Sequence, residues 1–598
     1  MVFSLSPAVT ITETDLSTIV PAVSSTPAAY VGPFVWGPVD EVTLISSENE
    51  LVSTFGEPDN DTAQSFFSAA NFLAYGGNLQ VVRVVDQSAS NAYAEATALT
   101  SSSSAGGEAI GLQIKNADHY ETVKSAYADA KFAAKYPGEL GNSLAIAIID
   151  ASASGVSVGN ANNIEDEFDA LPATSTYATG LGAAGINDEI HIAVIDEDGA
   201  WTGTQGTILE KFAFVSKASD AKKSDGSTNY YVDVINNQSQ YIWWLGHPEN
   251  AGDGTSSSSS AGVDLVDWGL TVAAIRDAGN TFAVLDGGDY GASLSGGTND
   301  NVVQADDLNN GWELFADSQT TDISLCITGP APAATAQHVV DSVAEVRKDC
   351  VAFISPLQED VVNVASSATQ LSNVTGFRST DLSDKSSSYA ILDSGWKYQY
   401  DRYNDTFRWV PLNGDIAGLC ARTDFDRDPW FSPAGFNRGN IKNVTKLAFN
   451  PTKAQRDILY KAGINPVVQQ AGQGTVLLGD KTLLTRPSSF DRINVRRLFI
   501  VLEKSIATSA NFTLFEFNDE LTRSQFVNQV EPFLRNVQSR LGITDFRVVC
   551  DETNNTPDVI DRQEFVADIF VKPNKSINFI QLNFVSTRSG ISFDELGA

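Results

Sequence analysis

Two glycine-rich stretches come closest to a nucleotide-binding motif. Residues 180–185 (GLGAAG) match the pattern GxGxxG, whose glycines bring the backbone close to a pyrophosphate. That motif needs an apolar strand before it and a helix after it, whereas LPATSTYAT precedes it and the strand-like IHIAVID follows. Residues 474–482 (GTVLLGDKT) approach a phosphate loop, but Asp480 takes the lysine position and would place a carboxylate against phosphate. We expect a loop in the first stretch, a strand over 476–478 in the second, and no nucleotide cofactor.

Three aspartates alternate in the segment TDFDRDPW, namely Asp424, Asp426 and Asp428. A spacing of two resembles the opening of a calcium-binding loop. A Pro-Trp pair follows, and the Gly and Glu that complete such a loop are missing. We therefore expect an ion-pair cluster with Arg422 and Arg427 rather than a metal site.

The histidines and cysteines do not form a catalytic or zinc-binding pattern. The four histidines are far apart, and none lies in a GxSxG or HExxH context, although a Ser–His or Cys–His pair could still meet in space. The four cysteines never form CxxC, which favours a reducing compartment without disulfides or zinc. We expect no catalytic residue, no metal and no cofactor, and thus no enzyme.

Strands and helices alternate in two separated parts of this chain of 598 residues. We predict a helix over 63–75, ended by Gly76 and Gly77, and a buried strand over 79–85. Strands are predicted again over 281–285, 323–327 and 350–354, with helices over 306–316 and 333–348. Such alternation is typical of a largely parallel sheet. We assign residues 23–87 and 266–385 to one discontinuous α/β core.

The rest of the chain differs from this core in composition and in its pattern of predicted elements. Residues 88–265 are rich in Ala, Ser, Gly and Asp, with strand-like bursts at 144–149 and 190–195, and we predict a β-rich outer insertion of one or two domains. Residues 386–564 are predicted to form an α+β domain with helices over 492–506 and 518–541. The fold class is multidomain α/β. In the second helix we expect Asn518 as N-cap, Gly542 at C′ and one apolar stripe. The stripe contains Val530, Leu534, Val537 and Leu541.

Both ends of the chain alternate apolar and polar residues, as strands do. Strands are predicted over 565–571 and 577–585, flanking a turn at 572–575. Neither end has a sheet of its own, and Pro7 confines the first strand to an edge. We predict intersubunit arms at 1–22 and within 565–598. The apolar arm residues are Phe3, Leu5, Val9 and Ile11 at one end, and Ile580, Leu582, Phe584, Ile591 and Phe593 at the other.

The charge is distributed unevenly along the chain, whose formal net charge is −35. Residues 386–598 hold 25 basic and 24 acidic residues, which leaves 14 basic and 50 acidic residues for the first 385. An acidic surface repels phosphates, so we expect no direct nucleic-acid binding. A salty habitat would also favour acidity. The balanced half can pair with other copies. Its candidate tube-facing or lateral charges are expected on faces of the predicted helix outside the apolar stripe: Asp519, Glu520, Arg523, Arg535 and Arg540.

The termini and the apolar segments bear on localisation. The first residues lack a basic region and carry Glu13 and Asp15, which argues against a signal peptide. No apolar run approaches the roughly 18–20 residues that a membrane-spanning helix needs, so we expect no membrane insertion.

Several segments resemble the phage tail sheath family, in the same order over nearly the whole chain. SPAVTITETD resembles its N-terminal arm, and PAAYVGPFVWGPVDEVTLISSENELVSTFGEP its first core segment. The most specific match is SGWKYQYDRYNDTFRWVPLNGDIAGLCARTDFDRDPWFSPAGFNRG, followed by GQGTVLLGDKTL, FDRINVRRLF and FIQLNFVSTRSGISFDE. KYPGELGNSLAIAI, GWELFAD and VRKDCVAFISP also fit.

The resemblance implies a contractile sheath in the virion, assembled in the host cytoplasm. Its subunits would stack as six-fold rings around a tail tube protein, exchange terminal strands, and meet baseplate and tail terminator proteins. Contraction would drive the tube through the host envelope, with the C-terminal part facing the tube and the insertions outside. Three alternatives remain: the sheath of a type VI secretion system or other injection particle, a cytosolic α/β enzyme, and a surface-layer protein.

Overall fold

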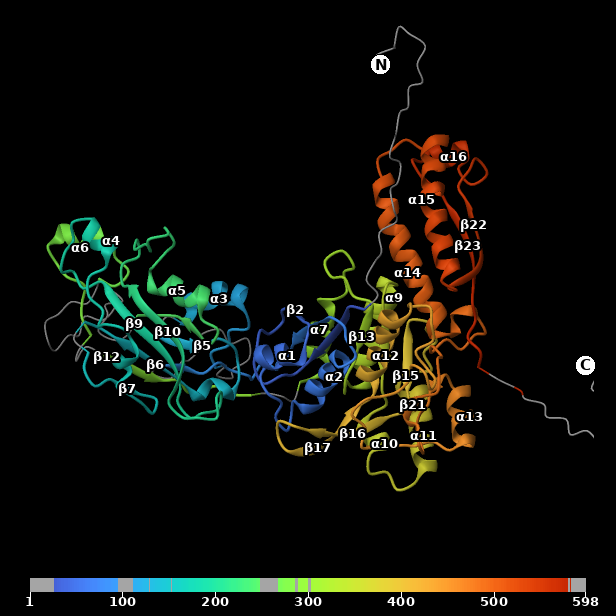
Figure 1. The fold of residues 1–598 in the computed structure, drawn as a ribbon, viewed down its shortest axis with the longest axis horizontal. Helices are drawn as coiled ribbons and strands as arrows, with labels where there is room; N and C mark the ends of the chain where they lie inside the picture. The colour runs from blue at the N-terminus through green and yellow to red at the C-terminus, as the bar shows by residue number, and fades with distance from the viewer. Residues whose placement is uncertain are drawn as a thin grey trace, which may run out of the picture.

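A seven-stranded sheet lies at the centre of the elongated molecule (Figure 1). The computed structural model of the chain describes residues 26–94, 111–127, 130–151, 153–247, 267–285, 289–299, 303–578 and 581. All neighbouring strands of the sheet are parallel except β2 and β3, so the predicted parallel sheet is confirmed. In spatial order the strands are β19 (Ile464–Asn465), β15 (Ala390–Asp393), β14 (Val351–Ile354), β13 (Leu325–Ile327), β1 (Ala28–Gly32), β3 (Leu79–Arg83) and β2 (Thr43–Ile45).

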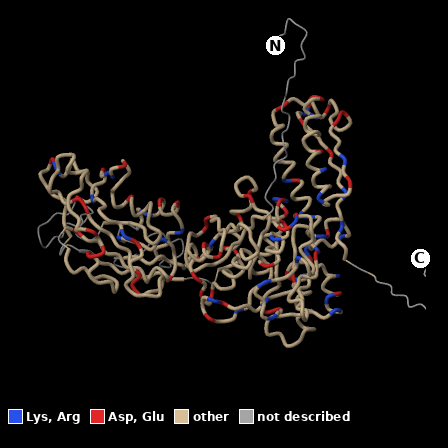
Figure 2. Tube along the Cα trace, in the orientation of Figure 1, with Lys and Arg blue, Asp and Glu red and all other residues tan. Residues whose placement is uncertain are grey.

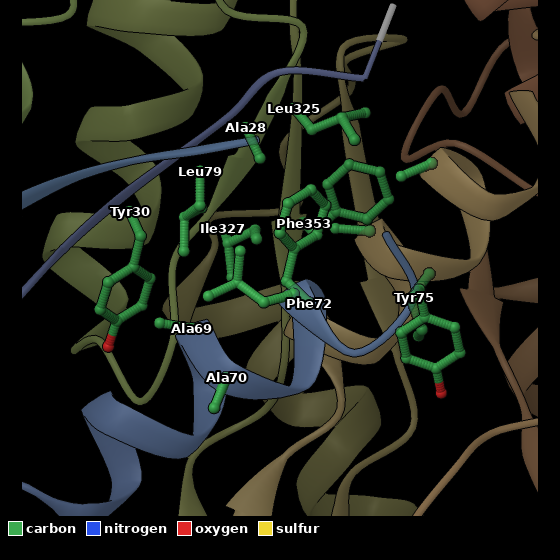
Figure 3. Packing of buried hydrophobic residues seen from close by; sticks show 14 of the residues in the cluster. Ala28, Tyr30, Ala69, Ala70, Phe72, Tyr75, Leu79, Leu325, Ile327 and Phe353 are labelled. Carbon is green, nitrogen blue, oxygen red and sulfur yellow. The ribbon is translucent and has the colours of Figure 1, made fainter. Parts of the chain in front are cut away.

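Helices cover both faces of this sheet, as the strand β1 illustrates. All five of its residues are buried, and its side chains alternate between two hydrophobic cores. One core includes α1 (Glu48–Phe55), α2 (Ala63–Leu73) and α12 (Asn413–Asp426), and Figure 3 shows Phe72 of α2 close to Phe353 of β14. The other core includes α7 (Ala305–Glu313), α8 (Ala333–His338), α11 (Ser367–Gly376) and α13 (Lys453–Lys461). The helix predicted over 333–348 is continuous but contains a π-helical segment, Val339–Ala344, before α9 (Glu345–Arg347).

Smaller elements complete this central part. A three-stranded antiparallel sheet contains β17 (Thr406–Pro411), β16 (Trp396–Asp401) and β18 (Lys446–Leu447), and a two-stranded sheet contains β20 (Val467–Gln470) and β21 (Gly474–Leu477). The short helix α10 spans Gln358–Val361, a π-helical turn spans Phe377–Asp381, and a 3-10 turn spans Ser489–Asp491.

A separate lobe lies at one end of the molecule (Figure 1). One antiparallel sheet contains β10 (Thr207–Ser216), β9 (Glu189–Asp196), β6 (Leu144–Ile149) and β12 (Asp289–Ser293). Another contains β11 (Ile242–Trp244), β5 (Phe132–Ala134) and β4 (Tyr93–Ala94), and β7 (Ser157–Val158) pairs with β8 (Ala161–Asn162). The lobe's helices are α3 (Ala117–Val123), α4 (Thr176–Gly180), α5 (Tyr231–Gln238) and α6 (Val272–Ala278), with 3-10 turns at Lys124–Tyr127, Glu139–Ser143 and Ile164–Glu167.

The buried side chain of Arg83, at the end of β3, ties the lobe to the core. Its guanidinium donates hydrogen bonds to the backbone carbonyls of Phe34 (2.9 Å), Gly37 (2.8 Å), Val35 (3.3 Å) and Pro137 (2.7 Å). Pro137 belongs to the lobe and the other three acceptors to the core, so one cation fixes both parts.

The C-terminal unit lies at the other end of the molecule (Figure 1). Helices α14 (Ile493–Ala510) and α15 (Glu520–Ser539) share a core with the two-stranded ribbon of β22 (Ile543–Val549) and β23 (Asp568–Pro573). A 3-10 turn, Asn511–Thr513, follows α14, and α16 (Pro557–Asp561) precedes β23. Within the described part of the chain, no helix is long and apolar enough to cross a membrane.

Four expectations about this organisation need correction. The predicted core strand 281–285 is wrong, because the backbone amide of Phe282 bonds to the Ile186 carbonyl of the lobe. The lobe extends past 265, since β12 pairs with β6. The core sheet extends past 385, since β14 pairs with β15. The predicted turn at 572–575 starts too early, because β23, which pairs with β22, includes Lys572 and Pro573. The full division into domains stays a prediction.

Candidate assembly surfaces

Neither nucleotide-like stretch has the geometry of a nucleotide site. Helix α4 ends at Gly180, residues 181–185 contain only turns, and β9 starts at Glu189, so no helix follows the glycines. In the second stretch β21 ends at Leu477, one residue before the predicted strand end. Asp480 is buried and accepts hydrogen bonds from Ser432 (3.0 Å), Arg492 (2.9 Å) and Ser576 (2.8 Å). Its carboxylate thus binds the protein's own C-terminal segment.

That segment passes along an open cavity of about 830 Å³, lined by residues 574–578 together with Trp430, Phe431, Tyr460 and Asp480. Tyr460 also donates a hydrogen bond to Asp480, at 3.2 Å. Its pKa is raised to about 12, mainly because the hydroxyl is buried and, to a smaller extent, because the negative charge of Asp480 is close. With its side-chain amide in the favoured orientation, Asn578 accepts from Arg492 at 2.7 Å. The start of the C-terminal segment is therefore fixed by hydrogen bonds. The sequence only excluded a phosphate loop here, through Asp480, and gave no sign of this anchoring role.

Two of the three alternating aspartates form ion pairs, and their partners are not the predicted arginines. Asp424 binds Arg497 at 2.7 Å, Asp428 binds Arg540, and Asp426 is exposed. These pairs join α12 and its following loop to α14 and the end of α15. Among the described residues, no group of three or more His, Cys, Asp or Glu side chains could hold a metal ion.

One histidine does meet a serine. Nδ1 of His338 is 3.4 Å from Oγ of Ser342, and Nε2 is 3.0 Å from Oε1 of Glu313. This arrangement has the residue types of a hydrolytic triad. However, the three side chains line none of the cavities of about 830, 730 and 220 Å³ found in the described part of the chain. The other histidines bond to neighbouring groups: His119 and His191 to backbone amides, and His247 to Tyr231.

Helix α15 differs in three respects from its prediction. Its N-cap is Asp519, whose side chain accepts from the Thr522 amide at 2.7 Å, and not Asn518. At its C-terminus Leu541 adopts the left-handed conformation (φ 64°), with Gly542 one position later. The Gly542 amide bonds to the Val537 carbonyl and the Leu541 amide to that of Gln538, which is a Schellman motif. Three stripe residues are buried as predicted, but Leu541 is exposed.

The candidate charges on α15 also separate into different roles. Arg523 is buried and donates to Oδ1 of Asn518 at 2.9 Å, so the expectation that it lies outside the apolar face is wrong. Arg535 pairs with Glu531 one turn away, and Arg540 pairs with Asp428 over the Trp430 ring. Asp519, Glu520, Arg535 and Arg540 are all exposed. Figure 2 shows acidic and basic residues interspersed over this unit.

The ribbon of β22 and β23 has no further strand beside it among the described residues. One face packs on α15 through Phe546, Val548, Ile569 and Val571, while Phe570 points outward and is exposed. A two-stranded ribbon is marginally stable alone, and its unpaired amides and carbonyls are a template for an added strand.

The connection between α14 and α15 exposes an unusual number of large apolar side chains. We call these residues the aromatic tip: Phe512, Leu514, Phe515 and Phe517. Phe517 is 84% exposed and Phe515 is fully exposed, with a positive φ of 70°. Sequence reasoning missed this surface, although the run NFTLFEF between two amphipathic helices was a visible signal.

Comparisons with known proteins identify the family. Three family models match in order along the chain: tail sheath protein Gp18 domain III N-terminal region at 26–84, phage tail sheath protein central domain at 301–483, and phage tail sheath C-terminal domain at 485–587. The tail sheath protein of Vibrio phage KVP40 is 37% identical over 679 residues, covering 99% of each chain. The chain belongs to the phage tail sheath family. The tail sheath protein of Enterobacteria phage T4 is 36% identical over 662 residues, again covering 99% of each chain.

A solved structure shares the fold of this family member. The sheath tail protein Lin1278 of Listeria innocua has a TM-score of 0.51 and 12% identity, covering 93% of this chain and 97% of that one. The predicted resemblance and the predicted function of a phage tail sheath protein are confirmed, and the chain is a structural component of a virion. The family-model matches stop at residue 84 and resume at 301, on either side of the lobe. The predicted arm residues, from Phe3 to Ile11 and from Ile580 to Phe593, lie outside the described residues.

Proposed function

We propose that this sheath protein polymerises with copies of itself around a tail tube and contracts to drive that tube through a host envelope. Its role is structural and not enzymatic. The curated relatives are phage proteins, which favours a phage tail over a secretion system or another injection particle. In this proposal the rings are six-fold, the partners also include baseplate and tail terminator proteins, and assembly takes place in the host cytoplasm.

The observation that carries the proposal is the ribbon of β22 and β23. Within the described part of the chain no third strand pairs with either edge of the ribbon, and both ends of the sequence alternate apolar and polar residues as strands do. A strand from another copy would complete the ribbon by β-augmentation, in which backbone hydrogen bonds supply the affinity. Each subunit would then be linked to its neighbours through its own backbone.

The C-terminal segment starts from a fixed point, which suits an arm that must transmit force. Asp480 holds Ser576, and Arg492 reaches Asn578, just before the chain leaves the described residues. If a neighbouring subunit pulled on an anchored arm, the force would be transmitted to the core of the subunit to which the arm belongs. Asp480 and Arg492, which anchor the subunit's own C-terminal segment, lie outside the ribbon. The anchor of the arm and the surface that would receive a neighbour's strand are therefore separate sites.

The two ends of the molecule favour opposite positions in the sheath. The balanced charges of the C-terminal unit suit contacts that are exchanged during contraction, because an exposed ion pair contributes only about 0–1 kcal/mol. The acidic lobe lies at the other end of the molecule (Figure 1). We therefore place the C-terminal unit against the tube and the lobe outside.

Removing the N-terminal arm tests the proposal. Deletion of residues 1–13 should leave a soluble, folded monomer that forms no long tubes, because strand exchange is lost while every described contact remains. Negative-stain electron microscopy measures tube formation, and size-exclusion chromatography with circular dichroism checks the monomer. Deletion of 101–104, a serine run within the predicted outer insertion, is the matched control and should leave tubes intact. Tubes of normal length from the arm deletion would refute strand exchange.

A further inference from the structure

The aromatic tip is an apolar surface that nothing in the described chain covers. Four large apolar side chains lie within six consecutive residues, and Leu521 on the first turn of α15 is exposed beside them in sequence. A single exposed apolar residue needs no explanation, but a contiguous group of this kind marks an interaction site. The tip lies in the unit that carries the ribbon, at the turn between α14 and α15 (Figure 1).

The backbone of the tip supports the same interpretation. Phe515 has a φ of 70°, a conformation that costs a bulky side chain free energy and that glycine or asparagine would adopt more easily. Its ring is fully exposed, so no contact within the described chain compensates that cost. A partner that buries the Phe515 ring would compensate this cost.

Hydrogen bonds connect the tip to the open ribbon. Asn518, directly after the tip, donates to Oδ1 of Asn555 at 3.1 Å and to the Glu564 carbonyl at 2.8 Å. Asn555 and Glu564 belong to the connection between β22 and β23. A strand that runs along the ribbon toward this connection therefore continues onto the tip.

The charges around the aromatic tip indicate which of the two arms would bind it. The tip carries Glu516 and is followed by Asp519 and Glu520, without a basic residue among 511–522. Residues 579–598 contain one basic and two acidic residues, so the C-terminal arm would meet like charge. Residues 1–12 hold no charged side chain and present Phe3, Leu5, Val9 and Ile11. The 25 residues before Thr26 reach up to roughly 80 Å when extended, which is enough to cross to a neighbour.

We propose that the aromatic tip is the docking surface for the apolar side chains of the N-terminal arm of a second copy. The inference rests on the proposed strand exchange and adds a side-chain site to it. The ribbon would supply backbone pairing for the arm, and the tip would bury its apolar residues and set its register.

Cross-linking between copies tests the occupant. Full-length chains with Leu5→Cys and full-length chains with Phe515→Cys are mixed, assembled into tubes and treated with a short bismaleimide. Because each chain carries only one new thiol and the four native cysteines are buried, a cross-linked dimer reports contact between two copies. We expect a dimer joined at positions 5 and 515. The control replaces Phe515→Cys by Phe425→Cys, since Phe425 is 89% exposed elsewhere, and should give no dimer.

The energetic test uses the double variant Phe515→Ser and Phe517→Ser. Its monomer should melt as the wild type does, because both rings are exposed. The critical concentration for tubes should rise at least about tenfold, since burying one phenylalanine is worth more than a tenfold change in an equilibrium constant. Phe425→Ser should leave the critical concentration unchanged.

The outcomes separate this inference from the proposed function. Failure of the wild-type chain to form tubes would refute the proposed function and the inference with it. If the wild type forms tubes and the double variant assembles equally well, only the role of the aromatic tip as a docking surface is refuted. Wild-type tubes without a dimer joined at positions 5 and 515, or with dimers joined only between two copies of position 515, would refute the N-terminal arm as occupant.

Discussion

The contact between α2 and α12 gives the sharpest prediction about the core. Helix α12 contains Gly414 and Gly418, one turn apart, and both face α2 or the residues just after it. A Cβ atom added at Gly414 would lie 2.3 Å from the backbone oxygen of Ser68. Backbone cannot rotate away as a flexible side chain can, so Gly414→Ala must push the two helices apart.

Two opposing effects set the magnitude. Overpacking of a tight core costs about 1–3 kcal/mol. Alanine in place of glycine inside a helix recovers up to about 1 kcal/mol. Because the clash is with backbone, the cost lies in the upper part of its range, and the net loss for Gly414→Ala is about 1–2 kcal/mol. Gly376→Ala in α11 is the matched control: its backbone is helical (φ −64°, ψ −48°), and an added Cβ would meet nothing within 4 Å. That variant should gain about 0.5–1 kcal/mol from helix propensity alone.

Hydrogen exchange measured by mass spectrometry is the appropriate assay, because a chain with several cores has no single free energy of unfolding. Amides of α2 and α12 should exchange about 5–30-fold faster in Gly414→Ala than in the wild type. The control should exchange no faster than the wild type in the same peptides. Equal protection in both variants would show that the helices separate without cost, and would refute the argument from close packing.

Two further predictions concern buried charges. Burial raises the pKa of Asp393 from 3.8 to about 8, although hydrogen bonds from Ser355 and Gly395 oppose the shift. The folded state therefore holds a proton that the unfolded state releases, and stability falls as pH rises from about 4 to 8, by about 4 kcal/mol at pH 7. Asp393→Asn should remove this slope from the urea transition of the central sheet, followed from pH 5 to 9 by the exchange of peptides that contain β15; a parallel pH profile for both proteins would contradict it. On α15, Arg523→Ala should destabilise the C-terminal unit by about 1–3 kcal/mol through its lost charged hydrogen bond, whereas Arg535→Ala should cost under about 0.5 kcal/mol. Thermal unfolding compares the two, and equal shifts would refute the assignment of Arg523 as buried and Arg535 as exposed.

The sequence by itself was sufficient for the fold class, the family and the main elements of the core. Local pattern decides these features. β1 is a continuous apolar run and β3 is mostly apolar, because both faces of a parallel sheet are buried, and α2 ends before two glycines. The apolar stripe of α15 was likewise visible, since helical periodicity places Val530, Leu534 and Val537 on one face.

Tertiary structure decided what each polar residue and each strand pairs with. Asp480 looked like part of a loop motif but holds Ser576, 96 positions away, and Arg523 looked solvated but is buried against Asn518. β12 joined the lobe and β15 the core because hydrogen-bonding partners are chosen in space, across more than 100 residues for β12. The exposure of the aromatic tip likewise depends on which segments lie beside it in space. An apolar run becomes core or docking surface according to what packs over it, and spacing along the chain does not contain that information.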